Sequence, residues 1–145
     1  MKKLQVAVLG ATGMIGQRFV QLLEDHPYFE IGGLYASERS EGKSLREVMK
    51  LKGIPFDEQT LNMKIEALEP KAIAKRCRLA FSGLPSDVAG DYETSLSKGG
   101  VAVFSNAASH RMVADVPLLI PEVNPDHLEL VKAQATYANG GFIVT

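Results

Sequence analysis

The chain has 145 residues, of which 46% are hydrophobic and 23% are charged, and its formal net charge is −1 at pH 7. This size and composition are those of one ordinary globular domain with a buried core, and the balanced charge offers no basic field that would favour nucleic acid or an anionic membrane as a partner. The single cysteine, Cys77, excludes an internal disulfide framework and a multi-cysteine metal site, and it fits a reducing cytoplasm.

A glycine-rich turn follows the first predicted strand. Leu4–Leu9 is an almost continuous apolar run, and Gly10, Gly13 and Gly16 follow it before a helical pattern that extends from about Gly13 to Asp25. This order suits a pyrophosphate, because glycines allow a sharp turn and close approach of backbone N–H groups, and a helix N-terminus attracts anions. The spacing is G-x-x-G-x-x-G, so a tight turn without a ligand is the alternative.

The second predicted strand, Phe29–Ala36, completes a strand–helix–strand unit of the length that a parallel crossover needs. Ser37, Glu38, Arg39 and Ser40 follow it directly. In dinucleotide-binding folds this position meets the adenosine ribose, where an acid binds a 2′-hydroxyl and an arginine binds a 2′-phosphate. We expect the two serines and the arginine to form an anion clamp that favours NADP over NAD; a polar surface turn is the alternative.

The next part of the chain is less regular. We expect a short helix over Leu45–Met49, a minor strand over Leu61–Ile65 and a helix over Pro70–Arg76, with proline in its first turn. Cys77 comes just before the following strand, at the end away from the expected ligands. A lone cysteine in that position is predicted to fill space rather than to act as a nucleophile.

Three more strands are predicted in the second half, over Leu79–Phe81, Val101–Phe104 and Phe142–Val144. Ligands in open parallel sheets lie at the carboxyl ends of the strands. Ser82 and Gly83, which end the first of these strands, are therefore candidates to line a cofactor cleft.

Two helices are expected between these strands. Ser86–Asp87 is the expected cap of a helix over Val88–Lys98, and Asn124 with Pro125 is the expected start of a helix over His127–Ala135. The alternation of strands and helices predicts a doubly wound, mostly parallel α/β sheet of the Rossmann type, with helices on both faces.

These motifs together resemble a known family. The glycine turn, the serine–arginine–serine turn, the sequence Phe-Ser-Gly-Leu-Pro-Ser at 81–86 and the sequence Ser-Asn-Ala-Ala-Ser-His-Arg-Met at 105–112 resemble the N-terminal half of aspartate-β-semialdehyde dehydrogenase of the archaeal and fungal type. The resemblance covers essentially the whole chain, and its most specific parts are 10–19 and 116–124. Malonyl-CoA reductase and N-acetyl-glutamyl-phosphate reductase are alternatives, because they differ mainly in their second domain.

The resemblance implies an NADP-dependent oxidoreductase. Such an enzyme reductively dephosphorylates aspartyl phosphate to aspartate semialdehyde through a cysteine thioacyl intermediate, in the biosynthesis of lysine, threonine and methionine. It implies a small-molecule substrate, a cytoplasmic location and a homodimer or tetramer for the full-length enzyme. Residues 1–145 would be its dinucleotide-binding domain.

The resemblance also implies a role for individual residues. Arg111 matches the arginine that binds the substrate's phosphate, for which a guanidinium is a good bidentate partner; a surface salt bridge is the alternative. The implied cofactor-binding residues are Gly10, Thr12, Gly13, Met14 and Ile15 for the pyrophosphate, Ser37, Arg39 and Ser40 for the 2′-phosphate, and Ser82, Gly83 and Asn106 near the ribose and nicotinamide.

The chain departs from the family in one respect. In the family, a segment like Phe-Ile-Val-Thr at 142–145 is followed by Asn-Pro-Asn-Cys, which carries the nucleophile, and Cys77 does not match it. We therefore expect no catalytic residue and no metal in this chain, and no activity from it alone. A helix from the C-terminal part of family members packs on this domain, so an exposed apolar patch is expected. A stand-alone nucleotide-binding module without catalysis is the alternative from another class.

Overall fold

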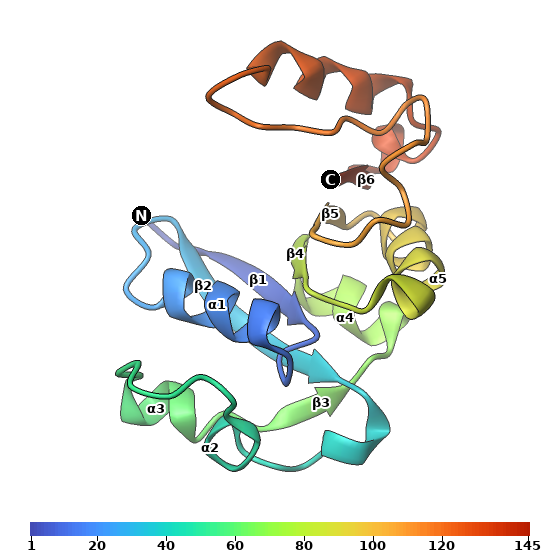
Figure 1. Cartoon of the computed structure of the whole chain (residues 1–145). Helices are drawn as coiled ribbons and strands as arrows, with labels where there is room; N and C mark the ends of the chain where they lie inside the picture. Colours follow the sequence, from blue (N-terminus) through green and yellow to red (C-terminus); the bar gives the residue numbers. More distant parts are fainter.

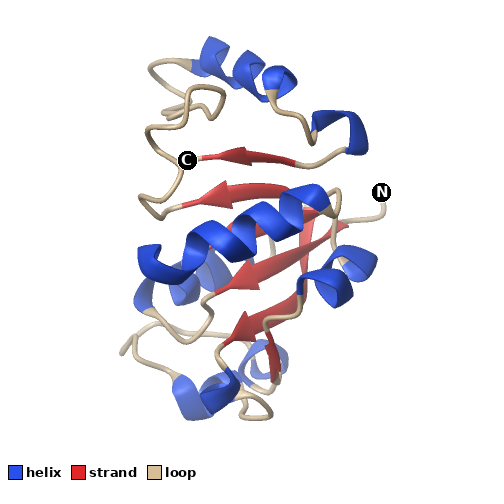
Figure 2. Ribbon diagram, turned by 90° about the vertical axis from the view of Figure 1, so that its right-hand side faces the viewer, coloured by secondary structure: helices blue, strands red, loops and turns tan.

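A parallel sheet of six strands forms the centre of the computed structural model, which describes residues 1–145. The strand order is β3-β2-β1-β4-β5-β6, and helices cover both faces (Figures 1 and 2). This confirms the predicted doubly wound α/β fold. The elements in chain order are β1 (Leu4–Leu9), α1 (Met14–Leu23), β2 (Phe29–Ala36), η1 (Glu38–Ser40), α2 (Leu45–Val48), α3 (Glu58–Leu61), β3 (Ile65–Ala67), α4 (Pro70–Arg76), β4 (Leu79–Ser82), α5 (Ser86–Lys98), β5 (Ala102–Ser105), η2 (Pro125–Ala133), η3 (Tyr137–Asn139) and β6 (Phe142–Val144).

Side chains of β1 enter two separate apolar layers. Val6 and Val8 pack on one face of the sheet with Val20 of α1, while Ala7 and Leu9 pack on the other face with α4 and α5. All four β1 side chains are fully buried. Because both faces of β1 are covered, its sequence is a continuous apolar run rather than an alternating one. None of the helices is long and apolar enough to span a bilayer.

The predicted bounds of β2, α4 and β6 are confirmed, but the strand predicted over Leu61–Ile65 is wrong. Residues Glu58–Leu61 form α3, and β3 covers only Ile65–Ala67. A short apolar run does not distinguish a strand from a helix by its periodicity. Here the buried Thr60 belongs to a single helical turn, and only Ile65–Ala67, further along the chain, pair with β2.

The start of α5 also differs from the prediction. The helix begins at Ser86 after Pro85, and neither the Ser86 nor the Asp87 side chain caps it. The Ser86 hydroxyl instead accepts a hydrogen bond from the backbone N–H of Ala108, 3.0 Å away. A residue that the sequence suggested as a helix cap therefore anchors the loop after β5.

The long connection from β5 to β6 runs beyond the edge of the sheet (Figure 1). Its η2 segment, Pro125–Ala133, is a 3-10 helix that begins and ends two residues before the predicted helix over His127–Ala135, and the Asn124 side chain does not cap it. The Asn124 Oδ1 atom accepts from the N–H of Ile120 instead. Gln134 fastens the connection to the sheet, since its side chain bonds both the N–H and the carbonyl of Ile143.

Three glycines bring β1, α1 and the turn after β4 into direct backbone contact. A Cβ atom at Gly16 would lie 2.1 Å from the Gly10 carbonyl oxygen, and one at Gly10 would lie 2.7 Å from the Gly83 carbonyl oxygen. A Cβ atom at Gly83 would lie 2.9 Å from the Gly16 nitrogen. Side chains at these positions would therefore push the three segments apart.

We expect Gly10→Ala to destabilise the fold more than Gly42→Ala. Both glycines have positive φ, +75° and +79°, but only Gly42 has open space around it. The change at Gly42 adds left-handed strain of about 1 kcal/mol, whereas the change at Gly10 adds a backbone clash and totals about 3 kcal/mol or more. Urea unfolding measures both free energies of unfolding, and equal losses would contradict the packing argument.

Candidate functional site: a cleft at the carboxyl edge of the sheet

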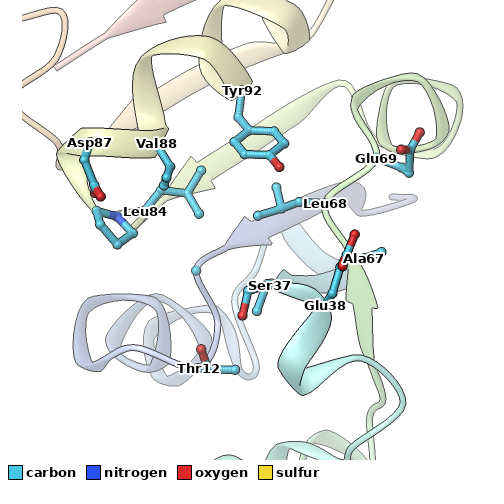
Figure 3. Close-up of a pocket in the computed structure, with 13 residues that line it drawn as sticks. Thr12, Ser37, Glu38, Ala67, Leu68, Glu69, Leu84, Asp87, Val88 and Tyr92 are labelled. Atoms are coloured by element: carbon cyan, nitrogen blue, oxygen red, sulfur yellow. The ribbon is translucent and has the colours of Figure 1, made fainter.

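A cavity of about 430 Å³ lies at the carboxyl ends of β1, β2 and β3 and beside the turn after β4 (Figure 3). The chain leaves β1 towards α1 on one face and leaves β4 towards α5 on the other, which creates the crevice where open α/β sheets bind ligands. The lining residues are Gly10, Thr12, Ala36, Ser37, Glu38, Ala67, Leu68, Glu69, Leu84, Pro85, Asp87, Val88 and Tyr92.

Two of the predicted pyrophosphate residues shape the turn without offering a free N–H group. The N–H of Gly10 donates to the carbonyl of Tyr35 at 2.8 Å, and the N–H of Gly13 donates to the carbonyl of Gly10 at 3.0 Å. The N–H of Ala11 also donates to Tyr35. The turn is thus fastened to β2 by one carbonyl oxygen.

The other three predicted pyrophosphate residues have free N–H groups. The backbone N–H groups of Thr12, Met14 and Ile15 donate no hydrogen bond within the chain. They lie at the start of α1, a helix of ten residues, where the helix dipole also favours negative charge. The start of α1 is therefore suited to hold an anion at the mouth of the cleft.

Gln17 of α1 supports this turn through hydrogen bonds, and no sequence motif pointed to it. Its side chain is fully buried; Nε2 donates to the carbonyls of Val48 and Thr12, and Oε1 accepts from the N–H groups of Lys50 and Leu51. Gln17 thus connects the glycine turn to the segment after α2. The only sequence signal was a polar residue on the apolar face of α1.

Only part of the predicted 2′-phosphate clamp lines the cavity. Ser37 and Glu38 lie in its wall, and Ser37 points towards Thr12 (Figure 3). Arg39 and Ser40 lie in η1 outside the lining, and the exposed Arg39 side chain makes no hydrogen bond or ion pair within the chain. The structure therefore brings the acid and one serine to the cavity and leaves the arginine free beside it.

The far wall of the cavity is apolar with an acidic rim. Leu68, Val88 and Tyr92 form the apolar side of the cavity, and the lining also contains Glu69 and Asp87 (Figure 3). No lysine or arginine belongs to the lining. A slot of this kind suits a flat aromatic base, whereas a phosphate would have to be held by the backbone N–H groups and by side chains beside the lining.

The remaining predicted site residues lie at the carboxyl edge but outside this cavity. Ser82 is fully buried, and its carbonyl accepts from the N–H of Asn106 at 2.9 Å. Gly83 packs against the glycine turn, as described above. Asn106 lines a separate cavity of about 310 Å³ at the ends of β5 and β6. Arg111 is exposed, and its Nη2 atom donates to the Asn106 carbonyl at 2.8 Å.

The side chains offer no nucleophile or metal site at the cleft. Cys77 is fully buried, and burial raises the pKa of its thiol, which disfavours the reactive thiolate. Burial likewise raises the pKa of Tyr35 to about 12. No group of three histidine, cysteine or acidic side chains is arranged to hold a metal ion. The site can bind and orient a ligand, but it lacks an activated nucleophile.

The sheet order, the switch-point cleft and the free N–H groups define a dinucleotide-binding domain of the doubly wound α/β class. Comparison with known families agrees with this. Residues 5–131 match the model of the semialdehyde dehydrogenase family, NAD binding domain. The chain belongs to this family.

Its curated relatives include archaeal and fungal aspartate-semialdehyde dehydrogenases. The protein from Archaeoglobus fulgidus is 43% identical over 142 residues, which cover 97% of this chain and 41% of the relative. The protein from Candida albicans is 43% identical over 142 residues, covering 94% of this chain and 38% of the relative. The chain therefore spans about two fifths of the length of the curated relatives it matches.

Solved structures show the same fold. The crystal structure of aspartate semialdehyde dehydrogenase with NADP from Candida albicans has a TM-score of 0.88 and 40% identity, covering 99% of this chain and 42% of that one. A Rex-family repressor has a TM-score of 0.55 and 18% identity over 74% of this chain, covering 46% of that one. At that identity the repressor shares the fold alone.

We expect NADP to shift the amide resonances of Thr12, Met14 and Ile15 most strongly in a ¹⁵N–¹H spectrum. Their N–H groups are free in the structure, so phosphate oxygens would become their first acceptors. The N–H groups of Gly10 and Gly13 already have acceptors and should shift less. Largest shifts at the ends of β5 and β6 instead would contradict the assignment of the cleft.

Proposed function

We propose that this chain is the NADP-binding domain of an aspartate-semialdehyde dehydrogenase. The observation that carries the proposal is the glycine turn at the switch point, with three free N–H groups beside a cavity of about 430 Å³, in a chain 43% identical to such enzymes. The cofactor would supply hydride. The chain's own residues would bind its pyrophosphate at the start of α1 and its adenine in the apolar slot near Leu68 and Tyr92.

The reaction we propose for the whole enzyme is the reductive dephosphorylation of aspartyl phosphate to aspartate semialdehyde, for the synthesis of lysine, threonine and methionine in the cytoplasm. The acyl group would be held as a thioester on a cysteine outside this chain, because Cys77 is buried away from the cleft. Arg111 would bind the substrate's phosphate, with Asn106 beside it. The exposed guanidinium uses one N–H on the Asn106 carbonyl, which leaves other donors for phosphate oxygens.

The coding sequence downstream of Thr145 tests the enzyme assignment. We expect it to continue with an Asn-Pro-Asn-Cys segment, which would place a nucleophile directly after β6 at the carboxyl edge of the sheet. The sequence further downstream would separate this enzyme from malonyl-CoA reductase and N-acetyl-glutamyl-phosphate reductase. A stop codon at this position would contradict the proposal and favour a non-catalytic nucleotide-binding module.

An uncovered apolar face supports the presence of further protein around this domain. The rings of Phe81, Phe104 and Phe142 form a row across β4, β5 and β6, with centroids 5.9 and 6.1 Å apart, on the face opposite α5. Each of these rings is only partly buried. We propose that the other three fifths of the enzyme cover this face and form its homodimer or tetramer. The exposed large apolar residues of the β5–β6 connection are Met112, Val113, Leu118, Ile120, Val123, Leu128, Leu130 and Tyr137.

NADP preference is proposed to depend on Arg39, with Ser37 and Ser40 as neutral donors. The arginine is free and adjoins the cavity wall at Glu38. Rotation of its long side chain would bring it to a 2′-phosphate, whereas Glu38 would accept a hydrogen bond from a 2′-hydroxyl. The two neighbours therefore act in opposite directions on cofactor choice.

We expect Arg39→Ala to weaken the binding of NADPH about tenfold and to leave NADH binding almost unchanged, because only NADPH offers the 2′-phosphate. Calorimetric titration of the chain with each cofactor measures both dissociation constants. Arg46→Ala is the matched control, since this exposed arginine of α2 pairs with Glu58. Equal weakening of both cofactors by Arg39→Ala would contradict the 2′-phosphate role, and no binding by the unaltered chain would contradict the proposed cofactor site.

A further inference from the structure

A buried carboxylate connects α5 to the loop after β5. Glu93 is fully buried, and its Oε1 atom accepts a hydrogen bond from the Ser105 hydroxyl at 2.6 Å. Its Oε2 atom lies 3.5 Å from Nε2 of His110, and neither of these two atoms has a hydrogen-bond partner in the chain. The Ser105 oxygen in turn accepts from the N–H of Ala107 at 3.0 Å. The cofactor cleft uses none of these side chains.

Because Glu93 is buried, the free energy of its carboxylate depends on the position of that loop. A carboxylate removed from water is costly unless nearby donors or positive charge replace its hydration. Of the two groups that face the Glu93 carboxylate, the Ser105 hydroxyl ends β5 and the His110 imidazole belongs to the loop. Moving the loop would take the imidazole away from Oε2 and leave only the Ser105 hydroxyl beside the buried carboxylate, so Glu93 resists that movement.

The same loop is fastened to α5 at a second point. The Ser86 hydroxyl accepts from the N–H of Ala108, and the Ser109 hydroxyl donates to the Ser86 carbonyl at 2.8 Å. Ser86 begins α5, and Glu93 follows about two helical turns later. The loop is therefore held at both ends of the helix segment that lies beneath it.

We propose that Glu93 and His110 are positioning residues for an anion site formed by Asn106 and Arg111. The inference rests on the proposed function, in which Arg111 binds the phosphate of the substrate. Arg111 directly follows His110, and its guanidinium donates to the carbonyl of Asn106. Asn106 lies in the sequence between Ser105, which bonds Glu93, and Ala108, which bonds Ser86. The contact between Glu93 and His110 holds the loop in its binding geometry before the anion arrives, which lowers the ordering cost of binding.

The test uses Glu93→Gln in this chain, with Asp91→Asn, an exposed acid of the same helix, as the control. The glutamine keeps the shape and an acceptor for Ser105 but removes the charge that faces His110. We expect amide hydrogen exchange at Ala107 and Ala108 to become about tenfold faster. The dissociation constant of inorganic phosphate, followed through the Arg111 side-chain resonance with NADP bound, should rise about tenfold, while NADP affinity stays unchanged.

His110→Gln provides an independent variant, and the double variant Glu93→Gln/His110→Gln completes a cycle. Non-additive effects, with the double variant no worse than either single one, would support a direct pair. Unchanged exchange at Ala107 and Ala108 would overturn the inference, as would an equal loss of phosphate and NADP affinity. Absence of phosphate binding by the unaltered chain would instead contradict the role of Arg111, while the exchange rates still decide whether Glu93 holds the loop.

Discussion

The cleft depends on the direct backbone contact of Gly10, Gly16 and Gly83. The turn after β1, the first turn of α1 and the turn after β4 touch through main-chain atoms, and a Cβ atom at any of the three positions would lie within 3 Å of a backbone atom. Sheet order alone places β1 beside β4, but it does not determine how close their following turns come. The glycines determine that distance, and therefore the separation of the two walls of the cleft between which a dinucleotide would bind.

This packing leaves N–H groups without a partner in the chain at the start of α1. The amides of Thr12, Met14 and Ile15 have no acceptor, and no side chain caps the helix at Gly13. A polar residue at the cap would have satisfied one of them and competed with an anion. The buried Gln17 holds the turn from the other side. The turn is therefore held in place by Gln17 while three of its N–H groups still have no acceptor in the chain. A bound pyrophosphate would stabilise the fold by mass action.

Local pattern predicted much of the fold because the informative residues act on their near neighbours. The apolar run of β1, the bounds of β2 and the proline at the start of α4 each depend on a few adjacent positions. The strand predicted over Leu61–Ile65 failed because Leu61 completes α3, residues 62–64 connect that helix to β3, and only Ile65 joins β3. Three-residue strands such as β3 form through pairing with β2, which no local pattern contains.

The candidate site was less predictable for the same reason. Glycine spacing indicated where the turn would lie, but it did not show that Gly10 and Gly13 use their N–H groups internally. The order Ser-Glu-Arg-Ser did not show which side chain of η1 would face the cavity. No sequence pattern singled out Glu93, because α5 carries several polar side chains. Its burial follows from the loop after β5, which folds over the helix.

The two halves of the sheet differ in how completely other elements cover their faces. The β1–β3 half has both faces covered, by α1 and α2 on one side and α4 on the other, and it carries the cavity and the free amides. The β4–β6 half is covered by α5 on one face, while the aromatic row lies partly open on the other. The proposed cofactor site uses only the first half and the turn after β4. Asn106 and Arg111, the proposed phosphate site, lie at the edge of the β4–β6 half. The proposed phosphate site thus adjoins the partly open aromatic row, since Asn106, Phe81 and Phe104 line the same cavity, and one further domain packed on that row could supply reactive groups beside it.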